Sequence, residues 1–308
     1  MDCAPPFNLT EEILDLCIGI AEKLGRIADK KILEKLPKLK EASLAQAIYS
    51  TLALEGNCLS YEQVFAIGNG EHVLGAAKEI REVKDAYKVY KELPALAWDN
   101  IADFLKSYKK ITGLSNKQYE QALATNMFDS ATQLLLWGKD SSAHPLIKSS
   151  VFHYRLKYMQ LPAKESGKIA RLWAAAVLTA WRPILAFIPI ESILLNQKAE
   201  YCKIKDLAVA EGSLNPFIMF MLQAILNAVE QLATDIDNHL LNTSDRVRRL
   251  MFAIQEHPMS ANELMVLLGL KSKAAFFDNY LHPAMQAGLV AMTLPGRPTS
   301  GNQRYYKK

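Results

Sequence analysis

The stretch that decides the fold runs from His144 to Trp173 and reads HPLIKSSVFHYRLKYMQLPAKESGKIARLW. Its pattern predicts a helix, a short polar loop and a second helix that starts at Gly167. Backbone N–H groups at a helix N-terminus can hold a phosphate, and Lys168 and Arg171 add positive charge beside this one. The loop contains no histidine, aspartate or cysteine that could act as a catalytic base or nucleophile. We therefore predict an anion site that lacks the usual catalytic groups.

Length and composition are those of an ordinary globular protein. The chain has 308 residues, half of them hydrophobic and 22% charged, which is enough for two domains with a sizeable core. The four cysteines, Cys3, Cys17, Cys58 and Cys202, form no CxxC pair. We expect reduced thiols and no metal site, rather than disulfides or zinc ligands.

No membrane segment is predicted. The apolar run Leu172–Leu195 is interrupted by Arg182, Pro183 and Glu191, which favours core helices over a membrane span. A signal peptide is not indicated either, because residues 10–25 carry four acidic side chains.

The net charge of +4 is unevenly placed. Residues 245–308 contain nine basic and four acidic side chains, so the remainder of the chain carries a net −1. A basic C-terminal segment is a weak indication of contact with nucleic acid there.

Helical periodicity dominates, and strand-like alternation is scarce before residue 289. Thr10 is a predicted N-cap of the first helix. A second helix is predicted from Ser43 to Leu54, and Ser60-x-x-Gln63 is a capping box that opens a third. The pattern favours a helical bundle, with a domain boundary near Asn238–Asp245.

The stretch from His144 to Trp173 resembles the core of Fic-domain proteins, which transfer AMP from ATP to hydroxyl groups of target proteins. Their signature is His-Pro-Phe-x-Asp/Glu-Gly-Asn-Gly-Arg-x-x-Arg. Aligned without gaps, it places Gln160 where the family has its base histidine, and Gly167, Lys168 and Arg171 on the second glycine and the two arginines. The metal-holding acid, the first glycine and the asparagine are also replaced. A one-residue deletion would put Glu165 at the acid position, but no register restores the histidine.

A second resemblance lies in SLAQAIYSTLALEGNCLSYEQV, residues 43–64. Many Fic proteins carry a helix with Ser/Thr-x-x-x-Glu-Gly/Asn, whose glutamate reaches the last arginine of the signature and blocks productive placement of the ATP γ-phosphate. Thr51, Glu55 and Gly56 match this inhibitory-type motif, and the downstream EVKDAYKVY also resembles the family. The resemblance implies an ion pair between Glu55 and Arg171. In the alternative interpretation, Glu55 merely sits in the last turn of a helix.

Two further features bear on catalysis. His153 lies about two helical turns before Gln160, and we expect it to be a structural histidine within the bundle. The amide of Gln160 does not accept a proton near neutral pH, so it does not replace a base. The family's β-hairpin flap, which aligns the acceptor by strand addition, has only Ser115–Ala143 available here. That segment shows no hairpin signal, so the flap is expected to be shortened or helical.

The C-terminal segment predicts three helices, Asp245–Ile254, a helix opened by Ser260-x-x-Glu263, and Ser272–Ala287, followed by a two-stranded wing. It resembles the winged-helix domain that follows the Fic domain in many bacterial members. The third helix and wing of such a domain can contact DNA. The alternative is a helical module that packs on the Fic core or mediates self-association. Candidate DNA contacts are Lys271, Lys273, Arg297, Arg304, Lys307 and Lys308.

The expected fold class is all-α, a Fic-like helical bundle followed by a small winged helix-turn-helix domain with a short β wing. The expected domains are residues 1–95 with the inhibitory-type helix, 96–240 as the Fic-like core, and 241–308. Three functions remain open: a catalytically impaired Fic protein that acts in binding or regulation, an active AMP or phosphoryl transferase with a non-standard site, and a winged-helix DNA-binding regulator. The resemblance implies ATP and magnesium as ligands, a protein partner, possible homodimers, and a bacterial cytoplasm.

Overall fold

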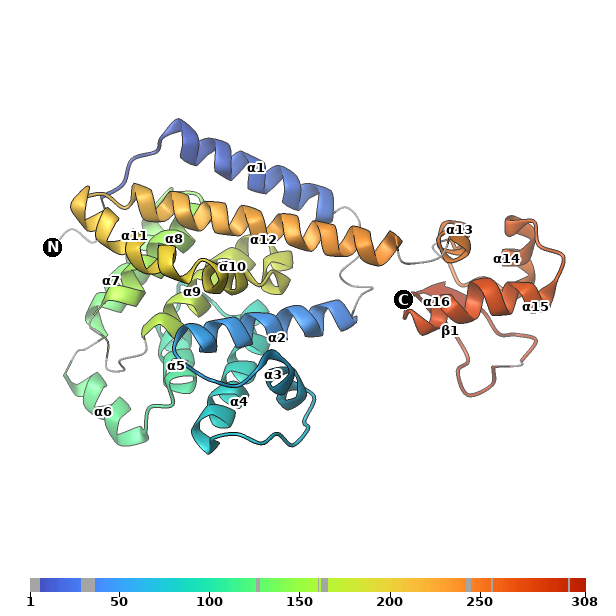
Figure 1. Cartoon of the computed structure of the whole chain (residues 1–308), viewed down its shortest axis with the longest axis horizontal. Coiled ribbons are helices and arrows are strands. Elements are labelled where there is room, and N and C mark those ends of the chain that lie inside the picture. The colour runs from blue at the N-terminus through green and yellow to red at the C-terminus, as the bar shows by residue number, and fades with distance from the viewer. Residues whose placement is uncertain are drawn as a thin grey trace. The chain divides into compact units, whose positions relative to one another are not determined.

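The computed structural model is mostly helical and describes residues 6–28, 37–125, 128–159, 161, 166–241, 245–255, 257–298 and 300–308 (Figure 1). The chain divides into two compact units. The first contains residues 1–25 and 41–230, and the second contains residues 26–40 and 231–308. The segments predicted as N-terminal helices and as Fic-like core therefore belong mainly to one compact unit. The boundary predicted near residues 238–245 overlaps positions outside the described ranges.

Helices form nearly all of the first unit, as the periodicity predicts. Its α-helices are α1 (Glu11–Ala28), α2 (Pro37–Leu54), α3 (Tyr61–Gly68), α4 (Ala77–Glu92), α5 (Ile101–Thr112), α6 (Asn116–Ala124), α7 (Asp129–Asp140), α8 (Pro145–Tyr158), α9 (Ser166–Trp181), α10 (Ile190–Asn196), α11 (Lys198–Ala210) and α12 (Asn215–Leu241), the first, second and last of which extend past its limits. Two 3₁₀ turns, η2 (Leu93–Ala95) and η3 (Pro183–Phe187), follow α4 and α9, each with a proline in its first turn.

Helix α9 is the centre of the first unit. Every residue from Gly167 to Ala174 is buried, so this helix contacts neighbours on all sides. It packs most extensively against α8, and also against α5 and the two 3₁₀ turns. Trp173 is fully buried, with its indole N–H donating to the carbonyl of Trp98 and its ring edge-on to Phe104. The stretch that the sequence singles out is thus the core itself.

Helices α1 and α12 lie side by side on one flank of the first unit (Figure 1). Lys23 forms an ion pair with Glu230, and the N–H of Leu214 donates to the carbonyl of Pro6 at 2.8 Å. Within the described chain, α12 has one stretch, Asn215–Asp235, that is long and apolar enough to cross a membrane. In that stretch 56% of the window is buried inside the protein, which is what a packing helix shows.

The predicted helix starts are confirmed at two places and corrected at a third. The hydroxyl of Thr10 accepts from the N–H of Ile13, and Ser60 forms a complete capping box with Gln63. Helix α2 begins at Pro37, six residues before the predicted Ser43. Proline is favoured at a first helical position because its fixed φ suits the helix and its missing N–H is not needed there.

The segment expected to be a shortened or helical flap is helical. Ser115 caps α6 with its side chain, and α7 follows and leads to α8. The strands that the structure describes all lie in the second unit. In the described part of residues 115–143, helices therefore stand where related proteins are expected to have a hairpin.

The second unit is a small helical domain with a two-stranded sheet. Its elements are α13 (Asp245–Ala253), α14 (Ala261–Leu268), α15 (Lys273–Phe276), a π-helical turn (Phe277–Leu281), α16 (His282–Gln286), β1 (Val290–Met292) and β2 (Tyr305–Lys307). The strands pair antiparallel, with Ala291 opposite Tyr306. Leu250, Leu264, Phe276 and Leu281 are all fully buried in its own hydrophobic core.

The capping box predicted at Ser260 and Glu263 is present. The third predicted helix, Ser272–Ala287, is not one regular α-helix, because a π-helical turn separates α15 from α16. Pro283 accounts for the irregularity, since it has no N–H to donate and its ring would clash with the carbonyl four residues earlier in a regular helix.

Candidate functional site

The site is built where the end of α2 meets the start of α9. Helix α2 ends in a Schellman motif: the N–H of Asn57 donates to the carbonyl of Leu52 at 3.0 Å, and that of Gly56 to Ala53 at 3.1 Å. Gly56 has φ of +90°, a conformation that residues with a side chain rarely adopt. The motif reverses the chain immediately after Glu55, and so fixes the carboxylate of Glu55 at the helix end.

An acidic residue at a helix C-terminus is unfavourable by itself, and Arg171 compensates it. Nη2 of Arg171 donates to Oε1 of Glu55 at 2.7 Å and to the carbonyl of Thr51 at 2.9 Å, while Nε donates to the hydroxyl of Thr51 at 2.6 Å. The guanidinium is buried and the carboxylate side chain is 20% exposed. The ion pair implied by the resemblance is therefore present, with Thr51 as a third member.

Gly167 lets the carboxylate approach α9. A Cβ built on Gly167 would lie 2.0 Å from Oε1 of Glu55 and 2.9 Å from Nη1 of Arg171. Glu55 thus occupies space that a side chain at position 167 would fill, next to the first turn of α9. We call this space, bounded by Gly167, Arg171 and the start of α9, the anion position.

The anion position has the chemistry of a phosphate site. The backbone N–H groups of a helix's first turn have no partner within the helix, and the helix dipole is positive there. Nη1 of Arg171 is buried and has no hydrogen-bond partner among the residues that the structure describes. An unpaired guanidinium N–H beside Gly167 fits an oxygen of a phosphate or carboxylate. The residues present therefore fit the phosphate groups of a nucleotide.

Lys168, the second predicted phosphate contact on α9, lies against a different carboxylate. Its ammonium is 3.4 Å from Oε1 of Glu82 in α4, and its side chain is only 2% exposed. Glu82 also accepts from Nδ2 of Asn57 at 3.0 Å. Glu82 was not predicted as a site residue, and the signal that pointed to it was the family resemblance of EVKDAYKVY, which begins with this glutamate.

The loop between α8 and α9 lies largely outside the described residues. Gln160, at the family's histidine position, and Glu165, the alternative acid, both fall there. Among the side chains that the structure does describe, no cluster of three or more His, Cys, Asp and Glu could hold a metal ion. The residues that could stand at the acid position of the signature lie outside the described residues, so this statement does not cover them.

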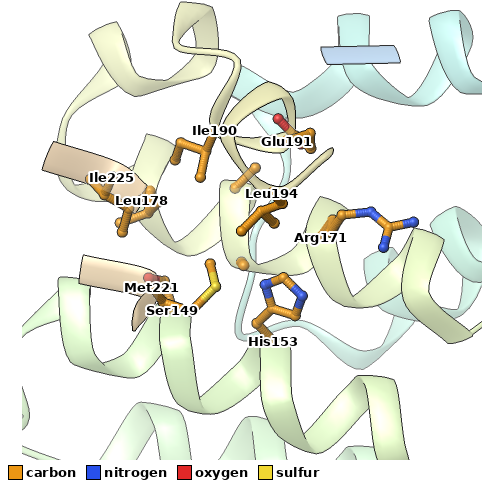
Figure 2. Close-up of a pocket in the computed structure, with 11 residues that line it drawn as sticks. Ser149, His153, Arg171, Leu178, Ile190, Glu191, Leu194, Met221 and Ile225 are labelled. Atoms are coloured by element: carbon orange, nitrogen blue, oxygen red, sulfur yellow. The ribbon is translucent and has the colours of Figure 1, made fainter. Parts of the chain in front are cut away.

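His153 is a buried structural histidine, as expected. Its Nε2 lies 2.7 Å from the hydroxyl of Tyr201, and burial, with smaller effects of Lys157 and Arg171, holds its pKa well below the usual value. His153 lines a cavity of about 20 Å³ that Glu191 and Arg171 also line (Figure 2). That volume matches a single water molecule.

Glu191 is a buried carboxylate that the sequence did not mark as a site residue. It accepts a hydrogen bond from Tyr90 at 3.0 Å, and burial raises its pKa. Burial also raises the pKa of Tyr201 to about 12, so its hydroxyl remains protonated beside His153. Polar groups therefore continue from the Glu55–Arg171 pair into the core between α8, α9 and α10. No sequence pattern predicted that these buried polar groups lie together, because they come from separate helices.

The predicted DNA contacts occupy different settings in the second unit. Lys271 and Lys273 are exposed at the start of the third helix, and Arg297 and Lys308 are exposed beyond it. Arg304 lies 3.4 Å from Glu263 and also contacts the carbonyl of Pro258, so its charge is partly compensated. Lys307 in β2 is half-buried.

Comparisons with known proteins show which proteins this chain is similar to. A family model described as the C-terminal domain of filamentation induced by cAMP protein Fic-like matches residues 245–306. Over 99% of this chain, the structure is similar to a crystal structure of a Fic family protein from Desulfovibrio desulfuricans G20, with 29% identity, a TM-score of 0.70 and 98% of that chain covered. These two matches support a Fic domain protein. No curated protein matches it.

A more distant Fic protein shares the fold. Fic-1 from C. elegans is 18% identical, with a TM-score of 0.57 over 70% of each chain. The helical fold predicted for this Fic protein is thereby confirmed, together with its small two-stranded sheet near the C-terminus.

Proposed function

We propose that this Fic protein is a catalytically impaired member of its family, which acts as a nucleotide-binding or regulatory protein rather than as an AMP transferase. The observation that carries the proposal is the carboxylate of Glu55, which Arg171 holds in the anion position against Gly167. A phosphate group that enters this position has to displace Glu55.

The replaced signature residues support the absence of transfer. Attack of a hydroxyl on the α-phosphorus of ATP forms a P–O bond, releases diphosphate and requires that the hydroxyl lose its proton. The amide of Gln160, which aligns with the family's base histidine, does not accept that proton. Loss of a general base typically lowers a rate by about two to four orders of magnitude. Magnesium, when bound, would neutralise phosphate charge, but the residue aligned with the family's metal-holding acid is Lys164.

Titration of ATP, with and without magnesium, into the wild type and the Glu55→Gly variant tests this proposal. Because the substitution empties the anion position, we expect ATP to bind at least tenfold more tightly, about 1.4 kcal/mol. Glu211→Gly is a matched control, since Glu211 also ends a helix and precedes a glycine of positive φ. We expect this control to bind ATP as the wild type does.

The same samples, incubated with ATP and magnesium, test for transfer by mass spectrometry. We expect no AMP adduct on either chain or on added protein. An AMP adduct made by the wild type or by Glu55→Gly would instead support the alternative that this protein is an active transferase. Equal ATP affinity of the wild type and Glu55→Gly would contradict the role proposed for Glu55.

A second candidate function is DNA contact by the C-terminal unit, read as a winged helix. It is favoured by the exposed lysines Lys271 and Lys273 at the start of the third helix. The exposed carboxylate of Asp278, in the same helix, is unfavourable for contact with DNA phosphates. Measurement of DNA affinity at several salt concentrations tests whether this unit contacts DNA.

A further inference from the structure

Glu82 joins two parts of the site that the sequence keeps apart. One of its oxygens lies 3.4 Å from the ammonium of Lys168, in the first turn of α9. The other accepts from Nδ2 of Asn57 at 3.0 Å, within the turn that presents Glu55. The same carboxylate therefore contacts both the helix that forms the anion position and the turn that fills it.

The pairing of Lys168 decides where its charge lies. Residues 168 and 171 are three apart on α9 and thus neighbours on the helix surface. Arg171 contacts Glu55, whereas Lys168 is drawn into the core beside Glu82, with 2% of its side chain exposed. Two adjacent cations at the start of α9 are consequently each held by a carboxylate from the N-terminal helices.

The turn itself is fastened to Glu79 and Glu82 of α4, and Nδ2 of Asn57 donates to the backbone carbonyl of Glu79 at 3.4 Å. Asn57 contacts Glu82, and the backbone N–H of Cys58 donates to Oε1 of Glu79 at 2.9 Å. Of these two glutamates, Glu82 also contacts Lys168 of α9. Glu79 therefore supplies an internal comparison: it fastens the turn as Glu82 does, but lies in no described ion pair with α9.

We propose that Glu82 is a second carboxylate lock on the anion position, which holds Lys168 away from an incoming phosphate and holds the turn that carries Glu55. This inference rests on the proposed function, in which Glu55 occupies the site of a nucleotide phosphate. Glu82 is a positioning residue, since it acts through Lys168 and Asn57. Opening the site fully requires that both carboxylates leave. Without the charge of Glu82, an incoming phosphate competes with one carboxylate fewer for the ammonium of Lys168.

The test compares ATP affinity in a Glu55→Gly background, where the first carboxylate is already gone. We expect Glu55→Gly/Glu82→Gln to bind ATP about five- to tenfold more tightly than Glu55→Gly, with a steeper loss of affinity as salt rises, because one more cation contacts phosphate. Glutamine at position 82 retains an acceptor for Asn57 but not the charge that holds Lys168. Glu55→Gly/Glu79→Gln is the control, and its affinity should equal that of Glu55→Gly.

A third substitution separates a lock on Lys168 from a general loosening of the fold. With Lys168→Met added, we expect Glu82→Gln to change the affinity of the Glu55→Gly chain less than twofold, since there is no ammonium to release. A gain that persists with Lys168→Met, or no gain over the Glu79→Gln control, overturns the role of Glu82 while leaving that of Glu55 intact. If Glu55→Gly alone binds ATP no better than the wild type, the proposed function fails instead.

Discussion

Each charged residue of the site is unfavourable by itself, and the pairing makes it tolerable. Glu55 ends α2 where the helix dipole disfavours an acid, and Arg171 is a buried guanidinium. A buried pair of this kind contributes little net stability, but removal of either partner alone strands the other charge. This asymmetry gives a structural reason for the pair to be present in a chain that lacks the base of the signature.

Substitution at Gly167 tests the geometry directly. We expect Gly167→Ala to destabilise the protein by about 1–3 kcal/mol, because its methyl group would displace the carboxylate that Arg171 holds. In a Glu55→Gly background the same change should cost much less, since only the 2.9 Å approach to Arg171 remains and alanine favours the helix. Urea unfolding of the four chains gives the coupling energy. If the losses in free energy of unfolding from Gly167→Ala and Glu55→Gly simply add in the double variant, Glu55 does not occupy the space beside Gly167.

The buried imidazole of His153 predicts a pH dependence. Burial holds its pKa well below 6.5 in the folded state, so the unfolded chain takes up a proton that the folded chain does not. Stability is therefore expected to fall as pH drops below about 6.5, by at most about 1.4 kcal/mol per pH unit from this group. Urea unfolding of the wild type and His153→Gln between about pH 7.5 and 5.5 checks this.

The difference in slope between these two chains isolates His153, because His144, whose pKa burial also lowers, is present in both. A His72→Gln variant controls for removal of an exposed histidine. Identical slopes for the wild type and His153→Gln would mean that the imidazole takes up its proton in the folded state too.

Residues with a local sequence signal were predictable, and those that act through tertiary contacts were not. Thr51, Glu55 and Arg171 were found through the family resemblance, and the structure brings them together. Glu82 and Glu191 were missed because an acidic side chain on a helix is usually expected to be solvated. The contact with Tyr90 distinguishes Glu191, and the contact with Lys168 gives Glu82 a role that its place in EVKDAYKVY does not specify.

At the scale of elements, helix starts were read correctly where a side chain caps the backbone. Ser60 and Ser260 head capping boxes that the sequence spells out within four residues. The start of α2 at Pro37 and the π-helical turn before Pro283 were missed. Both depend on how proline is accommodated, which a hydrophobic pattern does not encode.

The end of α2 and the start of α9 also explain why the anion position is occupied by a side chain of the protein itself. The Schellman turn after α2 and the first turn of α9 are both helix ends with backbone groups that their own helices do not satisfy. The carboxylate of Glu55, at the negative C-terminal end of α2, lies beside Gly167 in the positive first turn of α9. Complementary helix termini and one ion pair thus occupy the anion position, where we propose that a phosphate would bind.

At the scale of the whole molecule, two compact units separate two kinds of chemistry. The first contains the anion position and its carboxylates, and the second carries most of the basic surplus of the chain. The second unit has its own hydrophobic core, so substitution of its exposed lysines leaves the packing of that core intact. The two candidate functions can therefore be tested independently in the full chain.

For the second unit, DNA contact predicts a salt-dependent affinity that two lysines control. With phosphate contacts from Lys271, Lys273 and Arg297, a plot of log affinity against log salt should have a slope of roughly −2.7, at about 0.9 per contact. Lys271→Ala/Lys273→Ala should make that slope shallower by about 2, whereas the charge-matched Lys117→Ala/Lys139→Ala in the first unit should leave it unchanged. Fluorescence anisotropy of a labelled duplex measures both. Binding that is absent at low salt, or that the two double variants weaken equally, would leave the basic C-terminal surface to a role other than holding DNA.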